Sequence, residues 1–219
     1  MITFSIITNG ANPPLLHREI ESIEGACPPG SYEIIVVGEP PVGLPDTVKK
    51  IWDPQSARGG KICTLRNRGV AAAEGDIIVA VDDDFIFPEN FYEELSIPGR
   101  EWDVMVTRII NPDGTRFWDW STLGGPKGHV LLPYGQGDPH LYLTGGFIIM
   151  KSHVAKSVPW PEERGFYEEE DVYFSRDLLS RGYKIAFNMK IVMTHNDRRY
   201  TAIKGPRGTF VYRRENLQR

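Results

Sequence analysis

The chain contains only two cysteines among its 219 residues, Cys27 and Cys63, and they do not form a C-x-x-C pair. This spacing excludes a thiolate zinc site and a dithiol redox motif, and it is typical of a protein from a reducing compartment. No run of about 18 apolar residues occurs, and the first apolar stretch, 2–8, is too short for a signal sequence or a membrane helix. These absences predict a cytoplasmic protein without a transmembrane segment.

The sequence also lacks an overall basic charge. Hydrophobic residues make up 41% and charged residues 25%, as in one ordinary globular domain, and the net charge of −4 disfavours duplex DNA as the main partner. The charge is unevenly distributed, because residues 190–219 carry eight basic and two acidic side chains. A basic tail on an acidic body indicates an anion or an acidic surface as partner.

Apolar runs alternate with helical patterns in the first part of the chain. Expected strands cover 2–8, 33–37 and 76–81, and expected helices cover 15–23 and 60–73. This alternation predicts an α/β fold with a mostly parallel sheet covered by helices on both faces. In such sheets, ligands bind outside the carboxyl ends of the strands. The polar residues that follow the strands are Thr8, Asn9, Glu39 and the run 82–84.

The second part of the chain is less regular. Strands are expected at 104–110, 145–150 and 184–193, and a helix at 168–180, with Gly182 just past its end. The stretch 111–137 is rich in glycine, proline and tryptophan, so loops with at most a hairpin are expected there.

Three consecutive aspartates, Asp82, Asp83 and Asp84, follow the apolar run 76–81. Neighbouring carboxylates repel each other, and a divalent cation with a preference for oxygen ligands removes that conflict. Because alternate residues of an extended segment point the same way, Asp82 and Asp84 are expected to face one site and Asp83 the other side or a ribose. The alternative is a solvated turn that leads into the next helix.

Several motifs together resemble the family 2 glycosyltransferases. Residues 60–84 contain Arg66-Asn67-Arg-Gly69, Ala73-Glu-Gly75-Asp76 and the aspartate run, in the family's order R-N-x-G, A-x-G-D and D-x-D. Further along, 144–147 is similar to the acceptor-side strand of the family, and 168–171 with Arg176 is similar to its E-D helix. The resemblance covers about residues 1–195.

The resemblance implies a GT-A type fold, a Rossmann-like, mostly parallel sheet flanked by helices, for residues 1–195. It also implies an inverting, metal-dependent transfer of a sugar from a nucleotide diphosphate, most often UDP, to an acceptor hydroxyl on a glycan. Residues 196–219 are expected to form a basic tail, which is either a lid over the donor diphosphate or a solvated tail that docks on the acidic body.

The resemblance and the residue types assign expected roles. Asp84, Asp82 and His195 would bind Mn²⁺ or Mg²⁺, and Asp171 would be the general base, with Glu170 as the second candidate. The expected contacts to the nucleotide-sugar are Thr8, Asn9, Glu39, Lys61, Arg66, Asn67, Asp82 and Asp83. The expected acceptor contacts are Trp118, Trp120, Gly145 and Gly146. Glu39 departs from the family, which often carries an aspartate there to bind the base and ribose.

Other interpretations remain open from the sequence. A nucleotidyltransferase would use the same nucleotide and metal, but a glycine-rich phosphate loop of the G-x-G-T type is missing. A catalytically inactive sugar-nucleotide-binding module would keep the fold without turnover. A modified nucleic acid is an alternative acceptor, with the basic tail on its phosphates. For single residues, Arg66 also suits a salt bridge on a helix, His195 a buried histidine, and Trp118 a local core.

Overall fold

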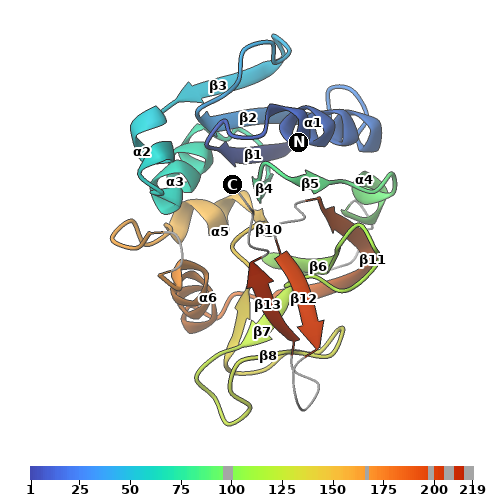
Figure 1. Ribbon diagram of the computed structural model, residues 1–219, viewed down its shortest axis with the longest axis vertical. Coiled ribbons are helices and arrows are strands. Elements are labelled where there is room, and N and C mark those ends of the chain that lie inside the picture. The colour runs from blue at the N-terminus through green and yellow to red at the C-terminus, as the bar shows by residue number, and fades with distance from the viewer. Residues whose placement is uncertain (96–100, 166–167, 197–199, 205–209, 215–219) are drawn as a thin grey trace.

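A computed structural model describes residues 1–95, 101–165, 168–196, 200–204 and 210–214, the last two ranges as backbone only. Its centre is an eight-stranded mixed sheet with the order β3-β2-β1-β4-β10-β6-β11-β5 (Figure 1). The strands of this sheet are β1 (Ile2–Thr8), β2 (Tyr32–Gly38), β3 (Val48–Trp52), β4 (Ile77–Asp82), β5 (Phe85–Ile86), β6 (Val104–Ile110), β10 (Phe147–Lys151) and β11 (Ile185–His195).

The direction of the strands brings several loops to one edge of the sheet. Strands β3, β2, β1 and β4 are mutually parallel, and β6 is parallel to β11. Strand β10 runs antiparallel to both β4 and β6, so these two point the same way. The carboxyl ends of β1, β2, β4, β6 and β11 therefore share one edge, and β10 starts there.

Helices cover both faces of the sheet, as the alternating sequence pattern predicts (Figure 1). The helices are α1 (Pro13–Ala26), α2 (Pro54–Arg58), α3 (Ile62–Ala72), α4 (Phe91–Leu95), α5 (Ser152–Ser157) and α6 (Glu170–Ser180). Side chains of α1 and α4 join one buried apolar cluster, and those of α3, α5 and α6 join another. In β1, Phe4 and Ile6 enter the first cluster and Ile7 the second, because alternate residues of a strand face opposite sides.

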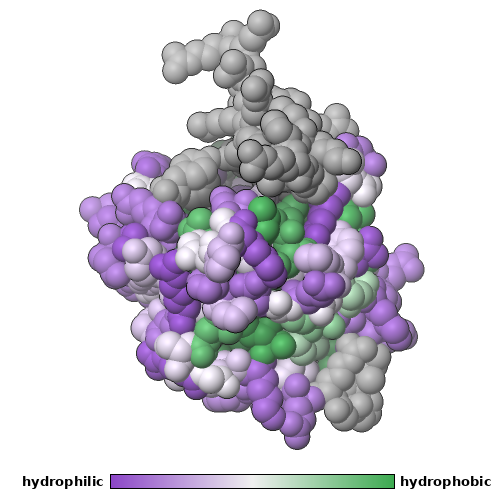
Figure 2. Space-filling view, turned by 90° about the horizontal axis from the view of Figure 1, so that it is seen from below, coloured by the Kyte–Doolittle hydropathy of each residue, from purple (hydrophilic) through white to green (hydrophobic). Residues whose placement is uncertain are grey.

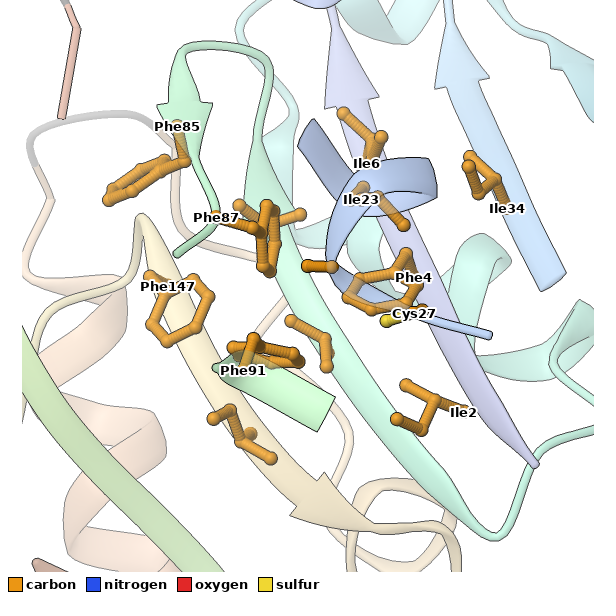
Figure 3. Close-up of a cluster of buried hydrophobic side chains, with 14 of the residues drawn as sticks. Ile2, Phe4, Ile6, Ile23, Cys27, Ile34, Phe85, Phe87, Phe91 and Phe147 are labelled. Atoms are coloured by element: carbon orange, nitrogen blue, oxygen red, sulfur yellow. The ribbon is translucent and has the colours of Figure 1, made fainter. Parts of the chain in front are cut away.

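Several phenylalanines pack together in the cluster under α1 and α4 (Figure 3). The ring of Phe87 lies edge-on to Phe4 at 5.1 Å and to Phe91 at 4.9 Å, a favourable aromatic geometry. Phe85 packs against Phe147 at 5.6 Å, which joins β5 to the start of β10. These contacts hold the segment after the aspartate run against the sheet.

A small three-stranded antiparallel sheet occupies part of the stretch where loops are expected. It consists of β7 (Trp120–Thr122), β8 (Val130–Leu131) and β9 (Leu141–Leu143), with β7 in the middle. Its strands are only two or three residues long, which explains why periodicity does not reveal them. A separate two-stranded sheet pairs β12 (Tyr200–Lys204) with β13 (Phe210–Arg214). Arg198, Arg199, Arg207 and Arg219 of the predicted basic tail lie outside the described residues.

The other predicted strands and helices are present, with β1 and β6 at the expected bounds. The sequence did not predict β3, an edge strand in which Lys49 and Lys50 interrupt the apolar pattern, or the short elements α2, α4, α5 and β5. The surface seen in Figure 2 is mostly hydrophilic, with small hydrophobic areas. Among the described residues, no helix is long and apolar enough to cross a membrane.

Candidate functional site

A cavity of about 200 Å³ opens at the carboxyl edge of the sheet. The end of β1, the end of β4 with the turn after it, the end of α2 and the start of α3 surround it, at the position where ligands bind to open α/β sheets. The residues that line it are Ile7, Thr8, Asn9, Ala57, Gly60, Ile62, Leu65, Asp82, Asp83 and Asp84. The lining therefore combines apolar side chains with three carboxylates, which suits a flat ring joined to a charged group.

Each aspartate of the run has its own partner. Arg66 Nη2 donates to Asp82 Oδ1 at 2.9 Å, the Thr8 hydroxyl donates to Asp83, and His195 Nε2 lies 3.3 Å from Asp84 Oδ2. The chain turns at Asp83 and Asp84 instead of staying extended, and all three residues line the same cavity. The expected alternation, with Asp83 on the other side, is wrong because it assumed an extended backbone.

The carboxyl groups of this loop are close enough to perturb one another. Burial raises the pKa of Asp83 to about 7, against a hydrogen bond from Thr8 that lowers it, and the charges of Asp84 and Asp82 raise it further. Burial also raises the pKa of Asp82, although Arg66 opposes that effect. Behind the loop, Glu19 of α1 is completely buried, and burial followed by the charges of Asp83 and Asp84 raises its pKa. A bound cation would relieve this accumulation of negative charge.

Asp84 and His195 form the best candidate metal ligands. Asp84 Oδ1 and His195 Nδ1 are buried without a hydrogen-bond partner among the described residues. The imidazole of His195 stacks on Phe117 at 3.9 Å and 10°, which orients it toward Asp84. No three His, Cys, Asp or Glu side chains converge on one point within the described part of the chain. The arrangement suits Mg²⁺ or Mn²⁺ bound by few protein ligands and completed by phosphate oxygens.

Arg66 connects the cavity to the start of α6. Its guanidinium, only 2% exposed, binds Asp82 on one side, and its Nη1 lies 3.8 Å from Glu170 Oε1 on the other. Its flat face lies 4.5 Å from the ring of Trp160, which stacks on Phe174 at 4.0 Å. Such burial favours a role in which Arg66 positions the two carboxylates, and the predicted donor contact would have to act through Asp82.

Two glycines, Gly145 and Gly146, allow the aspartate run and the start of α6 to lie close together. A Cβ at Gly146 would lie 3.3 Å from Asp82 Oδ2, and one at Gly145 would lie 3.3 Å from Asp171 Cβ. The backbone amide of Gly145 donates to Asp171 Oδ2 at 3.4 Å, and that of Asp82 donates to the Gly146 carbonyl at 2.9 Å. The turn before β10 therefore holds Asp171 beside the aspartate run.

Asp171 and Glu170 both have a pKa above that of a free carboxyl. Burial raises the pKa of Asp171, although the backbone amides of Val172 and Gly145 oppose it. Burial and then the charge of Asp171 raise the pKa of Glu170. A base works best when its pKa lies close to the working pH.

The other predicted donor residues have varied surroundings. Asn9 accepts from the Ala11 amide at 2.9 Å, and Glu39 forms an ion pair with the exposed Arg58. Lys61 is exposed at the start of α3. The side-chain amide of Asn67 binds the backbone of Trp160. Its nitrogen donates to the Trp160 carbonyl at 3.0 Å, and its oxygen accepts from the Trp160 backbone amide at 2.8 Å.

The two tryptophans predicted at the acceptor differ in accessibility. Trp118 is partly exposed beside Tyr142. Trp120 is completely buried, packs on Phe187 at 5.2 Å and donates to the Gln136 carbonyl at 3.1 Å. In place of the predicted acceptor contact, Trp120 forms the core of the small sheet.

Three residues of this region were not predicted from the sequence. Glu19 had a detectable signal, because it shares the apolar helical face of Leu16, Ile20 and Ile23. Phe117 and Trp160 had none, since their roles depend on His195 and Arg66, which are distant along the chain.

No protein-family model matches the chain, and no curated protein matches it. Solved structures do match. S. aureus TarS 1-349 has a TM-score of 0.68 at 16% identity, over 90% of this chain and 60% of that one. The same protein in complex with UDP-GlcNAc has a TM-score of 0.60 at 15% identity, over 90% of this chain and 58% of that one. GalNAc-T7 with UDP, GalNAc and Mn²⁺ has a TM-score of 0.65 at 16% identity, over 90% of this chain and 44% of that one.

The chain thus has the fold of GT-A glycosyltransferase structures, a mixed, mostly parallel sheet with flanking helices. At 15–16% identity the likeness concerns the fold alone. The chain spans between 44% and 60% of the length of these three matching chains.

Proposed function

We propose that this chain is a metal-dependent, inverting glycosyltransferase that moves a sugar from a nucleotide diphosphate, with UDP as the preferred nucleotide, to an acceptor hydroxyl. The observation that carries the proposal is the position of Asp171. Its carboxylate accepts from the amide of Gly145, next to the glycine that packs against Asp82 of the cavity. A donor bound in the cavity would therefore present its sugar to a partly buried base.

The cavity supplies the groups that a nucleoside diphosphate needs. Ile7, Ala57 and Leu65 offer an apolar slot for a base, and the Thr8–Asp83 pair offers hydrogen bonds to ribose hydroxyls. The solved structures support this use, since the TarS structure contains UDP-GlcNAc and the GalNAc-T7 structure contains UDP.

A divalent metal would be held by Asp84 and His195, with Asp82 as a further candidate. When bound, it would neutralise the charge that develops on the departing diphosphate. The unpartnered Asp84 Oδ1 and the raised pKa of Asp83, caused first by burial, support a cation at this loop. GalNAc-T7 was solved with Mn²⁺.

Asp171 would take the proton of the acceptor hydroxyl as that oxygen attacks the anomeric carbon. One base and one direct displacement invert the configuration at that carbon. Proton transfer to a positioned carboxylate is worth about 10²–10⁴-fold in rate. Glu170 is less suited to be the base, because its carboxylate lies 3.8 Å from the Arg66 guanidinium, which stabilises the charged form and makes it a weaker proton acceptor.

The proposal is tested by thermal shift with UDP, GDP, CDP and dTDP, each with and without Mn²⁺. At 100 times its Kd, a ligand stabilises the folded state by about 2.7 kcal/mol. For a chain of this length that corresponds to a rise in Tm of about 5–10 °C. We expect UDP with Mn²⁺ to give the largest shift, and Asp84→Ala to remove the part that needs metal.

Further measurements separate the alternatives. If no nucleotide shifts the Tm of folded protein, the proposed donor is wrong. If UDP binds but UDP-sugars are not turned over with any acceptor, the chain is a non-catalytic binding module. Release of diphosphate from a nucleoside triphosphate with a sugar phosphate would instead indicate a nucleotidyltransferase.

A further inference from the structure

Three aromatic rings on the small sheet form a hydrogen-bonded cluster that the donor chemistry does not use. Three residues, here called the ring cluster, come from the segment before β7, the position just before β8 and the middle of β9: Trp118, His129 and Tyr142. Trp118 Nε1 donates to the Tyr142 hydroxyl at 2.7 Å, and that hydroxyl lies 2.6 Å from His129 Nε2. The rings of Trp118 and His129 meet edge to face at 4.7 Å.

The hydrogen bonds of the cluster have a direction. An indole nitrogen only donates, so the Tyr142 oxygen accepts from Trp118 and the Tyr142 hydroxyl can donate to His129 Nε2. Partial burial lowers the pKa of His129, which favours the neutral ring that accepts this proton. Neutral His129 then carries its remaining proton on Nδ1, as a donor available to a ligand.

The cluster is not part of the core of the small sheet. That core consists of Trp120, Leu132, Leu141 and Leu143, which are all buried. His129 is exposed and Trp118 is partly exposed, whereas Tyr142 is 4% exposed and holds the two together. Polar ring edges at a surface are suited to a ligand with hydroxyl groups.

The cluster lies beside the proposed base. Strand β9 is joined to α6 by the bond from the Leu143 amide to Ser175 Oγ at 2.9 Å, and Gly145 follows two residues later with its bond to Asp171. Burial raises the pKa of Tyr142, and the charge of Asp171 raises it further, which agrees with this proximity.

Glu169 lies beside the ring cluster and has an unusual backbone conformation. It is the one non-glycine residue with a positive φ, 59°, among those that the structure describes. Strain of this kind gathers at binding and catalytic sites. The side chain is exposed immediately before Glu170 and Asp171, and its charge acts on both His129 and Tyr142.

The charges around the cluster disfavour an anionic ligand. Residues 168–171 are four consecutive acids at the start of α6. Among the described side chains, Lys127 pairs with Asp138 at 2.8 Å, and Arg164 and Arg176 lie over the ring of Tyr173 at 3.4 and 5.7 Å. A carboxylate beside aromatic rings is instead suited to hydroxyl groups and to the C–H faces of a sugar.

We propose that the ring cluster together with Glu169 is the acceptor platform of this chain, and that it takes a neutral carbohydrate. This inference rests on the proposed glycosyl transfer and adds to it the chemical class of the acceptor. His129 then donates to the acceptor and Trp118 packs on it, while Tyr142 positions both rings.

The test measures binding of methyl glycosides of glucose, galactose, mannose and N-acetylglucosamine by saturation-transfer NMR, with and without UDP and Mg²⁺. Methyl glucuronide serves as the anionic comparison. We compare Tyr142→Phe and His129→Gln with wild type. Tyr134→Phe is the matched control, because Tyr134 lies in the same segment but stacks on Arg116 at 4.2 Å, outside the cluster.

At least one neutral glycoside should bind at millimolar concentration. Each of the two cluster variants should weaken the binding of that glycoside about 2- to 12-fold, which is the range expected for one lost hydrogen bond. The control variant Tyr134→Phe should bind it as wild type does. Thermal melts with UDP establish that each variant is folded and still binds the donor. His129 is exposed, so His129→Gln decides the question even if Tyr142→Phe does not fold.

Three results would overturn the inference: no neutral glycoside binds wild type, the glucuronide binds more tightly than all of them, or both cluster variants bind as wild type does. Failure of the donor chemistry is recognised separately, because it removes the UDP-dependent thermal shift while the glycoside titration without nucleotide is still measured.

Discussion

Replacing Asp83 with asparagine is expected to make the metal-free protein less sensitive to alkaline pH. Burial raises the pKa of this carboxyl in the folded state to about 7, whereas an unfolded aspartate has a pKa of about 3.9. A raised pKa in the folded state stabilises the fold only while the group keeps its proton. That stability is complete below about pH 4 and is lost as the pH rises through about 7.

The size of the effect follows from these two pKa values. Between about pH 5 and pH 8, ionisation of Asp83 costs the folded state about 2.5 kcal/mol. This is an upper value, since Asp83 lines an open cavity and water screens part of its charge. For a chain of this length the loss corresponds to a fall in Tm of about 5–10 °C. Asparagine keeps an oxygen for the Thr8 hydroxyl and has no proton to lose as the pH rises.

The assay is thermal unfolding of wild type and Asp83→Asn with a chelator present, at pH 5 and at pH 8. The informative quantity is the difference between the two proteins at each pH, because the buried carboxyls of Glu19 and Glu170 are present in both. Asp46→Asn, at an exposed aspartate, is the control and should behave as wild type. Equal loss of Tm in wild type and Asp83→Asn would show that Asp83 does not hold a proton in the folded state.

Three further predictions concern single residues of the site. Asp84→Ala should abolish the Mn²⁺-dependent part of the UDP thermal shift without lowering the Tm of the free protein; an unchanged shift would move the metal elsewhere. Asp171→Asn should keep UDP binding and lose about 10²–10⁴-fold in transfer rate, and full activity would move the base to Glu170. Arg66→Met should lower the free energy of unfolding by about 3 kcal/mol in urea denaturation, because it leaves the carboxylates of Asp82 and Glu170 without their cation. An unchanged urea midpoint would mean that solvent already screens this pair.

Much of the sheet could be predicted because its strands are marked locally. The run at β1 is continuous, β-branched and ends at Asn9-Gly10, so its bounds are visible without a partner. The elements that escaped prediction are short or amphipathic at the edge. Strand β5 has two residues and exists because it pairs with His195 and Thr194 of β11, a contact that no local pattern records.

Some residues of the candidate site could likewise be predicted from the sequence, and others could not. The aspartate run and the acidic start of α6 stand out as unusual clusters of charge, so the sequence alone predicted them as functional. The burial of Arg66, by contrast, depends on Trp160 and on the segment that Asn67 binds, both almost a hundred residues later. The complete burial of Trp120 in the small sheet could not be read from its neighbours either.

The sequence by itself determined that the chain folds as an α/β domain and that polar groups follow the ends of its strands, because periodicity and strand ends are local properties of the chain. Only the tertiary structure decided which groups meet. The antiparallel course of β10 brings Gly145 and Gly146 between Asp82 and Asp171, and the end of β11 places His195 beside Asp84. These meetings depend on strand order and register, which are set by packing between residues far apart in the chain.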